Sequence, residues 1–192
     1  TKDGKILAVG THLDDGYGNN STDSGVIHLF TFDDSDFTNA TYAASIGNDY
    51  TGGKNYDTSG ISGWSAAQVA IDGDGNRLAI GHHNEEVVRV FGFEDTSLNG
   101  ASLQFTIGIG QTGSNSVNAA SHGVVVDDGF PNVIALDDTG TLMAVGSTGD
   151  DGLNNDATDA GAVYLWSDTI IQGATSYTDF ASDDVVINKT EL

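Results

Sequence analysis

The sequence predicts an all-β protein made of three related units, and three observations lead to this prediction. An apolar segment that ends in glycine occurs three times, as GKILAVG at 4–10, GNRLAIG at 75–81 and GTLMAVG at 140–146. A second apolar segment follows each of them, and no stretch shows convincing helical periodicity. Short apolar runs bounded by Gly, Asp and Asn are typical of buried strands joined by turns. We therefore expect three quasi-repeats of about 65 residues, arranged radially or like propeller blades.

Each unit is expected to contain four antiparallel strands, of which the segments above are the first. The second strands share an apolar alternation with an aromatic residue near the end: GVIHLFTF at 25–32, VVRVFGF at 87–93 and GAVYLWS at 161–167. A third strand lies in the first two units, where 30–47 aligns with 91–108 without a gap. A gap-free alignment of that length indicates duplication.

A fourth strand is expected to lead from each unit into the next, at 64–72 and at 132–138. The first unit lacks a leading strand of its own, and the last strand, 184–190, is expected to take that place. The repeats then cover about 1–70, 71–135 and 136–192 of a single binding domain. Because the chain enters a strand at once and does not begin with methionine, we expect it to be a monomeric module of a longer multidomain polypeptide.

The composition limits the classes of partner. Six Lys and Arg against 28 Asp and Glu give a net charge of −22, which excludes nucleic acid and makes anionic membrane surfaces unsuitable. The chain has no cysteine and no apolar run long enough to span a bilayer, so neither disulfides nor membrane insertion are expected. So large an acidic excess repels itself unless cations neutralise it, and divalent cations are therefore expected.

The strongest candidate metal sites are two acidic loops, DDGYGNNSTDSG at 14–25 and DDGLNNDATDAG at 150–161. The corresponding oxygen-bearing residues are Asp14, Asp15, Asn19 and Asp23 in the first loop and Asp150, Asp151, Asn155 and Asp159 in the second. Calcium prefers carboxylate, amide and carbonyl oxygens, so each loop predicts a Ca²⁺ site that stabilises the fold. The alternative is a solvated turn capped by Asp and Asn. The middle unit joins the same two strands through the much shorter HHNEE link, which favours a role beyond connection.

A further candidate is DGDGN at 72–76, where Asp72, Asp74 and Asn76 occupy positions one, three and five of an EF-hand-like loop. The sixth position, where that motif has glycine, is Arg77, and no closing glutamate follows. A calcium site and a tight Asp-Gly hairpin turn therefore both remain open.

The candidate ligand site is the glycine-rich stretch NDYTGGKNYDTSGISGW at 48–64, which is too long for a simple connection. It carries Tyr50, Lys54, Tyr56 and Trp64, a set of aromatic anchors around one cation. One interpretation is that these aromatics close the core where two units meet. The other is a groove in which Lys54, or a calcium ion with an open position, receives a carboxylate.

Catalytic motifs are lacking, because the chain has no GxSxG, no HExxH and no cysteine nucleophile. GIGQTG at 108–113 matches a phosphate-binding pattern, but no helical segment follows it, so it is interpreted as a turn of the repeat. We expect a binding protein rather than an enzyme.

The pattern of an Asp-Gly turn, xLAxG, DDGxxNN and GxVYLF resembles the FG-GAP-type calcium-binding β-repeats of integrin-like propellers and bacterial surface proteins. The three units, the size and the absence of cysteine resemble the calcium-dependent peptide-binding domain of large bacterial RTX adhesins. That resemblance implies an adhesion module at the outer bacterial surface, exported by type I secretion, which grips the carboxyl termini of polypeptides on a host or partner cell. The alternatives are a carbohydrate-binding module that takes glycans, or a structural propeller segment.

Overall fold

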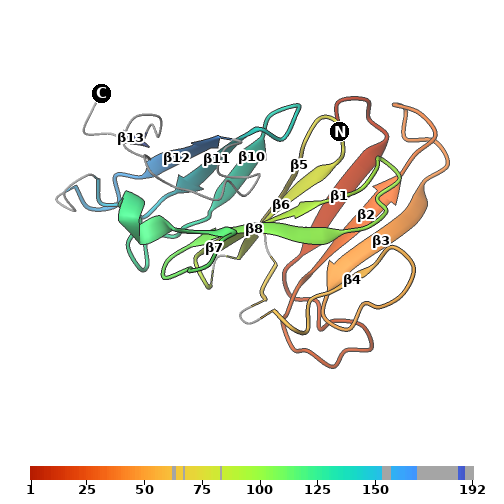
Figure 1. The fold of residues 1–192 in the computed structure, drawn as a ribbon, viewed down its shortest axis with the longest axis horizontal. Helices are drawn as coiled ribbons and strands as arrows, with labels where there is room; N and C mark the ends of the chain where they lie inside the picture. The colour runs from red at the N-terminus through yellow and green to blue at the C-terminus, as the bar shows by residue number, and fades with distance from the viewer. Residues whose placement is uncertain (62–63, 67, 83, 153–156, 168–185, 189–192) are drawn as a thin grey trace.

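The computed structural model describes residues 1–61, 64–66, 68–82, 84–152, 157–167 and 186–188. These residues form three β-sheets that follow one another along the chain (Figure 1). A short 3-10 helix, Ala119–His122, precedes the third sheet, and no helix among the described residues has the length and hydropathy that crossing a membrane needs. The expected all-β class is confirmed.

The first sheet has four strands in the order of the sequence. They are β1 (Ile6–Thr11), β2 (Val26–Thr31), β3 (Thr41–Gly47) and β4 (Tyr56–Asp57). The first three pair antiparallel, whereas β4 adds to β3 in parallel over two residues. Because β4 is so short, it extends the edge of the sheet rather than forming a full strand.

The second and third sheets have five and four strands. The second contains β5 (Gln68–Ile71), β6 (Arg77–His82), β7 (Val87–Gly92), β8 (Ser102–Gly108) and β9 (Ser116–Asn118). The third contains β10 (Val133–Leu136), β11 (Leu142–Ser147), β12 (Ala162–Ser167) and β13 (Val186–Asn188). The third sheet is antiparallel throughout, and in the second only β9 pairs in parallel.

Three details of the expected units are wrong. The expectation of four antiparallel strands per unit holds only for the third sheet. The strands expected to close the first two units, β5 and β10, instead open the second and third sheets, so the sheet boundaries lie before 68 and 133. The last strand, β13, pairs with β12 and does not complete the first sheet. The reason for the second difference is the tight turn after β5 and after β10, which folds each of these strands back onto the next one.

The duplication of 30–47 in 91–108 is visible in the backbone. Asp34 Oδ1 accepts hydrogen bonds from the backbone N–H groups two and four residues later, and Asp95 Oδ1 does the same. The register of the sheet shifts at corresponding places, between Leu29 and Phe30 and between Val90 and Phe91.

The second sheet lies between the other two (Figure 1), and β5 contacts both β1 and β10. Its Leu78, Ile80 and Phe91 pack in one core with the first sheet. Its Val88 and Val90 pack in another core with the third sheet. The described strands therefore form three successive layers that share two cores, and they do not close into a ring.

The core between the first two sheets predicts a large effect for Phe91→Ala. Phe91 is fully buried and meets the edges of the Tyr56 and Trp64 rings at centroid distances of 5.1 and 6.0 Å. The substitution should lower the free energy of unfolding by about 3–5 kcal/mol, since it removes apolar burial and leaves a cavity. Urea unfolding followed by circular dichroism measures this. Phe37→Ala is the control, because that side chain is 59% exposed, and an equal loss in both variants would contradict the assignment of the core.

Candidate functional site

The two acidic loops fold with the same hydrogen bonds. Asp14 Oδ1 and Asp150 Oδ1 each accept from the backbone N–H two residues later, at 2.9 and 2.8 Å. Asp15 Oδ1 and Asp151 Oδ1 each accept from the N–H eight residues later, both at 2.8 Å. The backbone N–H donors at the ends of the two loops also match, since Gly25 and Gly161 donate to the carbonyls of the first aspartates. The loops are therefore structural duplicates as well as sequence duplicates.

Left-handed backbone conformations occur where the loops place Asn and Asp. Asn19 and Asp23 have φ of 57° and 53°, and Asp159 has φ of 51°. Asn and Asp tolerate this conformation better than other non-glycine residues. Asn155, the fourth predicted ligand of the second loop, lies outside the described residues. The turn alternative thus accounts, without a metal, for most of the residues that the two loops share.

The calcium ligands predicted for these loops do not form a cage in the described structure. One oxygen of each leading aspartate is directed at the backbone of its own loop. Among the residues described, no three side chains of His, Asp or Glu gather closely enough to hold a metal ion. Calcium at the loops therefore stays a prediction that rests on their charge and recurrence.

The leading aspartate of the second loop is more deeply buried than that of the first. Asp150 is 4% exposed, and the Tyr164 hydroxyl donates a hydrogen bond to its Oδ2. Burial and this contact raise the pKa of Tyr164 far above its ordinary value. Asp128 lies nearby, and burial, with the charges of Asp150 and Asp151, raises the pKa of its carboxyl. Sequence spacing does not connect Asp128 with this loop, because Asp128 reaches the loop only through the folding of the third sheet.

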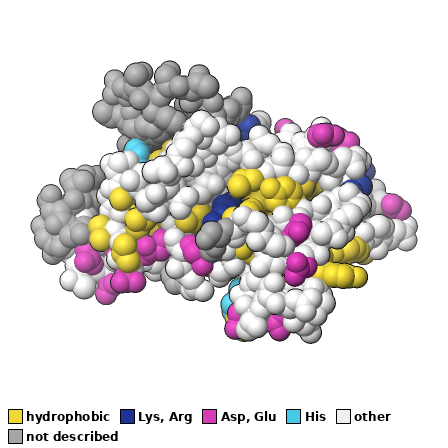
Figure 2. Space-filling view, turned by 60° about the horizontal axis from the view of Figure 1, so that its bottom comes forward, with side chains coloured by type: hydrophobic (Ala, Val, Ile, Leu, Met, Phe, Trp, Pro, Cys, Tyr) yellow, Lys and Arg dark blue, Asp and Glu magenta, His cyan; other side chains and the backbone are white. Residues whose placement is uncertain are grey.

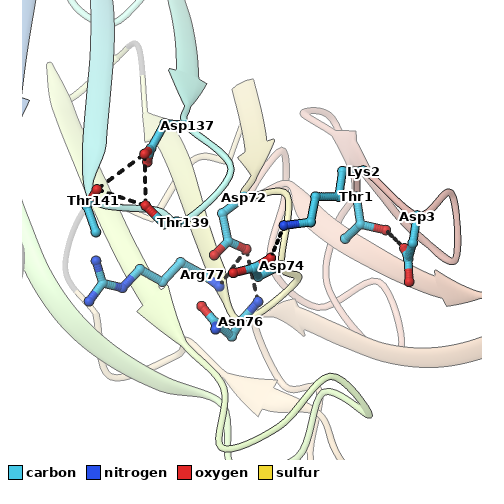
Figure 3. Close-up of polar contacts among 10 residues, drawn as sticks. All are labelled: Thr1, Lys2, Asp3, Asp72, Asp74, Asn76, Arg77, Asp137, Thr139 and Thr141. Carbon is cyan, nitrogen blue, oxygen red and sulfur yellow. Dashed lines mark hydrogen bonds and ion pairs between the residues drawn. The ribbon is translucent and has the colours of Figure 1, made fainter.

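Asp72, by contrast, is a buried carboxylate with an oxygen that lacks a partner. Its Oδ1 accepts from the backbone N–H groups of Asn76 and Arg77 at 2.9 and 3.0 Å. Asp72 is fully buried, and its Oδ2 has no hydrogen-bond partner among the described residues. The Arg77 guanidinium extends away from it (Figure 3) and donates to the carbonyl of Gly140 at 2.6 Å. Burial consequently raises the pKa of Asp72.

The turn that carries Asp72 lies between two neighbouring segments. On one side, Lys2 pairs with Asp74 through its ammonium group, and its N–H donates to the Gly73 carbonyl at 3.1 Å. On the other side, the N–H of Asp74 donates to the Asp138 carbonyl at 2.9 Å. Gly73 must be glycine here, because a Cβ would lie 2.7 Å from Asp138 Oδ1. The turn therefore joins the three sheets at one end.

The EF-hand-like arrangement predicted for Asp72 and Asp74 is not formed. Asp72 uses one oxygen to cap its own turn, and Asp74 is directed at Lys2. Equivalent caps occur in the neighbouring turns, where Thr1 Oγ1 accepts from the N–H of Ile6 and Asp137 Oδ1 accepts from the N–H of Leu142. The hairpin alternative therefore accounts for Asp72, and Asp74 links the turn to the start of the chain.

The four predicted ligand-binding residues do not share one groove. Trp64 is 7% exposed, lies in the core of the first two sheets and donates its indole N–H to the Gly25 carbonyl at 3.2 Å. Tyr56 packs against the same core. Tyr50 lies on the other face of the first sheet, beside Tyr17 at 5.7 Å between ring centroids. The core interpretation is correct for Trp64 and Tyr56, and β4, which carries Tyr56, lies beside β3.

Lys54 instead reaches a pocket between the first and second sheets. Its ammonium donates to the Ser97 carbonyl across the two sheets. The pocket, of about 310 Å³, is lined by Asp3, Lys5, Ile6, Thr31, Phe32, Lys54, Asp74, Thr96 and Ser97. Lys5 is not among the residues predicted from the sequence, because no sequence pattern around it links the start of β1 with the distant Lys54.

Charge distinguishes this pocket from the rest of the surface. On the face drawn in Figure 2, acidic side chains are spread over the surface and basic ones are few. Lys5 and Lys54 line the pocket with Asp3 and Asp74, and Lys2 neutralises Asp74 by its ion pair. Three of the six basic residues of a chain with net charge −22 thus lie at one place. The pocket, named here the lysine pocket, can take an anionic group.

Comparisons with known proteins leave the family open. No protein-family model matches the chain, and no curated protein matches it significantly. A periplasmic gluconolactonase of Pseudomonas aeruginosa is 12% identical, with a TM-score of 0.46 over 86% of this chain and 37% of that one. A hypothetical selenium-binding protein of Sulfolobus tokodaii is 11% identical, with a TM-score of 0.43 over 84% and 34%. The chain spans about a third of the length of these two proteins, and likeness at this level supports no conclusion about activity.

The buried carboxyl of Asp72 predicts an unusual pH dependence. Because its pKa is raised in the folded protein, its contribution to stability is present below the ordinary pKa of about 4 and is lost as the pH rises through the raised value. Asp72→Asn keeps an oxygen for the turn and removes the buried charge. Its free energy of unfolding at pH 7, in chelator, should equal or exceed that of the unchanged protein.

Asp137→Asn provides the control, because hydrogen bonds lower the pKa of the equivalent carboxyl in the third sheet. That variant should lose stability at pH 7, since the favourable charge is absent, and the difference should shrink as the pH falls. Urea unfolding at several pH values measures both. A large destabilisation by Asp72→Asn in chelator would show that the charge of Asp72 is itself stabilising.

Proposed function

We propose that this protein is a ligand-binding module that takes a carboxylate group, as at the carboxyl end of a polypeptide, in the lysine pocket. The observation that carries the proposal is the placement of Lys5 and Lys54 on one pocket in an otherwise acidic chain. Ammonium groups form charge-assisted hydrogen bonds with carboxylates, which are about twice as strong as neutral ones. An adhesive role at a bacterial surface is the setting that the FG-GAP-like repeats suggest.

The pocket offers both a positive charge for the carboxylate and an apolar wall for the neighbouring side chain. Lys5 and Lys54 supply the positive charge, and Ile6 and Phe32 supply an apolar wall for the terminal side chain. Lys54 is already held by the Ser97 carbonyl, so less of its freedom is lost on binding. Asp3 accepts from the Thr1 hydroxyl and from the N–H of Lys5, which ties the wall of the pocket together.

Binding of short peptides tests the proposal. Peptides with a free carboxyl end should bind, and the same peptides with an amidated end should bind at least about tenfold more weakly. Lys5→Gln and Lys54→Gln should each weaken binding of the free acid by a similar factor, whereas Lys54→Arg should largely retain it. Isothermal titration calorimetry measures the dissociation constants.

Asn115→Asp is the matched control, because it also makes the net charge more negative by one and lies outside the pocket lining, beside Thr106 of β8. It should leave peptide binding unchanged. Equal binding of the free and amidated peptides, or no effect of both lysine substitutions, would contradict the pocket assignment. Binding of glycans alone on an array would favour the carbohydrate-binding alternative.

Calcium at the two acidic loops belongs to the same proposal. Its support is the net charge of −22 and the recurrence of Asp14, Asp15, Asp150 and Asp151 in equivalent loops. A cation that binds only the folded protein stabilises it by mass action. Excess chelator should therefore lower the melting temperature by several degrees, and calcium should restore it. Asp15→Asn should lose part of this response, with Asp36→Asn as control, and an unchanged melting curve would remove calcium from the proposal.

A further inference from the structure

Among the described residues, each outer sheet has exposed apolar side chains on one face that no other sheet covers. The face of the first sheet directed away from the second carries Leu7, Val9, Phe30 and Tyr42, and is named here face A. Leu7, Val9 and Tyr42 are 42%, 39% and 51% exposed. The face of the third sheet directed away from the second carries Val133, Leu142, Ala144, Val163 and Leu165, and is named here face B. Val133 and Leu142 are 60% and 56% exposed, and Val163 and Leu165 are 39% and 38% exposed.

The internal repeat shows what covers face A elsewhere in the molecule. The positions of Leu7, Val9 and Phe30 are occupied in the second sheet by Leu78, Ile80 and Phe91, which are fully buried against the first sheet. In the third sheet they are occupied by Met143, Val145 and Trp166, at most 2% exposed and buried against the second sheet. Every described counterpart of face A is thus covered by a neighbouring sheet.

The same holds for face B. The positions of Val163 and Leu165 are occupied in the second sheet by Val88 and Val90, which are fully buried against the third sheet. In the first sheet they are occupied by Ile27 and Leu29, which are fully buried against the second. Each internal interface therefore joins a face of type B to a face of type A.

Faces A and B also suit each other, because their strands carry no acidic residues and their shapes are complementary. Although the chain has 28 acidic residues, β1, β2, β3, β10, β11 and β12 contain no Asp or Glu. Face B has a hollow of about 340 Å³ over the small side chains Ala135 and Ala144. Their counterparts in the second sheet, Ala70 and Ala79, lie in one core with Met143 and Trp166. By that correspondence the hollow fits Leu7 and Phe30 of face A.

We propose that two copies of this chain associate head to tail, with face B of each copy packed on face A of the other. A second copy carries both face types with the residues that already pack together twice within the chain, so the contact continues the internal interfaces. A contact between unlike faces closes into a ring when its rotation allows. Two copies bring together six sheets, within the range of about four to eight found in closed propellers.

Sedimentation equilibrium of the unmodified chain tests the proposal. From about 1 to 100 µM protein, the mass should rise from the 19.8 kDa of one chain towards twice that value. Association should strengthen with added salt, because each copy carries a charge of −22 and salt screens the repulsion between copies. Val9→Lys on face A and Leu165→Lys on face B should each raise the dissociation constant at least about tenfold.

Mixing the two variants separates head-to-tail contact from other kinds. One copy then keeps an intact face B and the other an intact face A, so the mixture should form a mixed pair that neither variant forms alone. Leu13→Lys is the control: Leu13 is 61% exposed but lies beyond the end of β1, and this variant should associate normally. Circular dichroism and the unfolding midpoint confirm that each variant is folded.

Four results would overturn the proposal. They are a single-chain mass at every concentration, a pair that survives both substitutions, a mixture that fails to associate, and open-ended polymers. The variants lie at exposed positions, so loss of association in a folded variant reports on the contact itself.

Discussion

The structure depends on one constraint, which is that the second sheet is apolar on both faces. Leu78, Ile80 and Phe91 project from one face, and Val88 and Val90 project from the other. Burial of apolar surface contributes about 25 cal/mol per Å², so neither face can be left in water at low cost. A sheet must therefore lie on each side, and the order of the three sheets, the shared turns and the pocket between the first two follow from that.

Much of the fold could be predicted, because its units repeat. The three glycine-ended strands and the gap-free match of 30–47 with 91–108 correspond to real strands and to the same register shift. The sheet to which β5 and β10 belong could not be predicted, since a strand at a unit boundary can pair with either neighbour. The parallel strands β4 and β9 have two and three residues, too few for a periodic signal.

The candidate sites were harder to predict, and the reason is chemical. The carboxylate oxygens that would bind calcium also accept hydrogen bonds from backbone N–H groups, and the structure shows Asp15 and Asp72 in that second role. An aromatic residue in a long loop can face a ligand or the core, and Trp64 faces the core. The lysine pocket joins Lys5 to Lys54 through the packing of two sheets, which local sequence does not encode.

The repeated interfaces are apolar, yet each includes a polar residue at one position. Arg89 and Tyr164 occupy that position at the two interfaces, and His28 occupies it on face A; each has different surroundings. His28 Nδ1 lies 2.6 Å from Ser45 Oγ, Tyr164 donates to Asp150, and the charge of Glu85 acts on Arg89. Buried polar groups cost free energy unless their partners are in place, so Arg89 and Tyr164 favour one pairing of sheets over another. The apolar repeat makes the sheets stack, and the variable polar position makes their order specific.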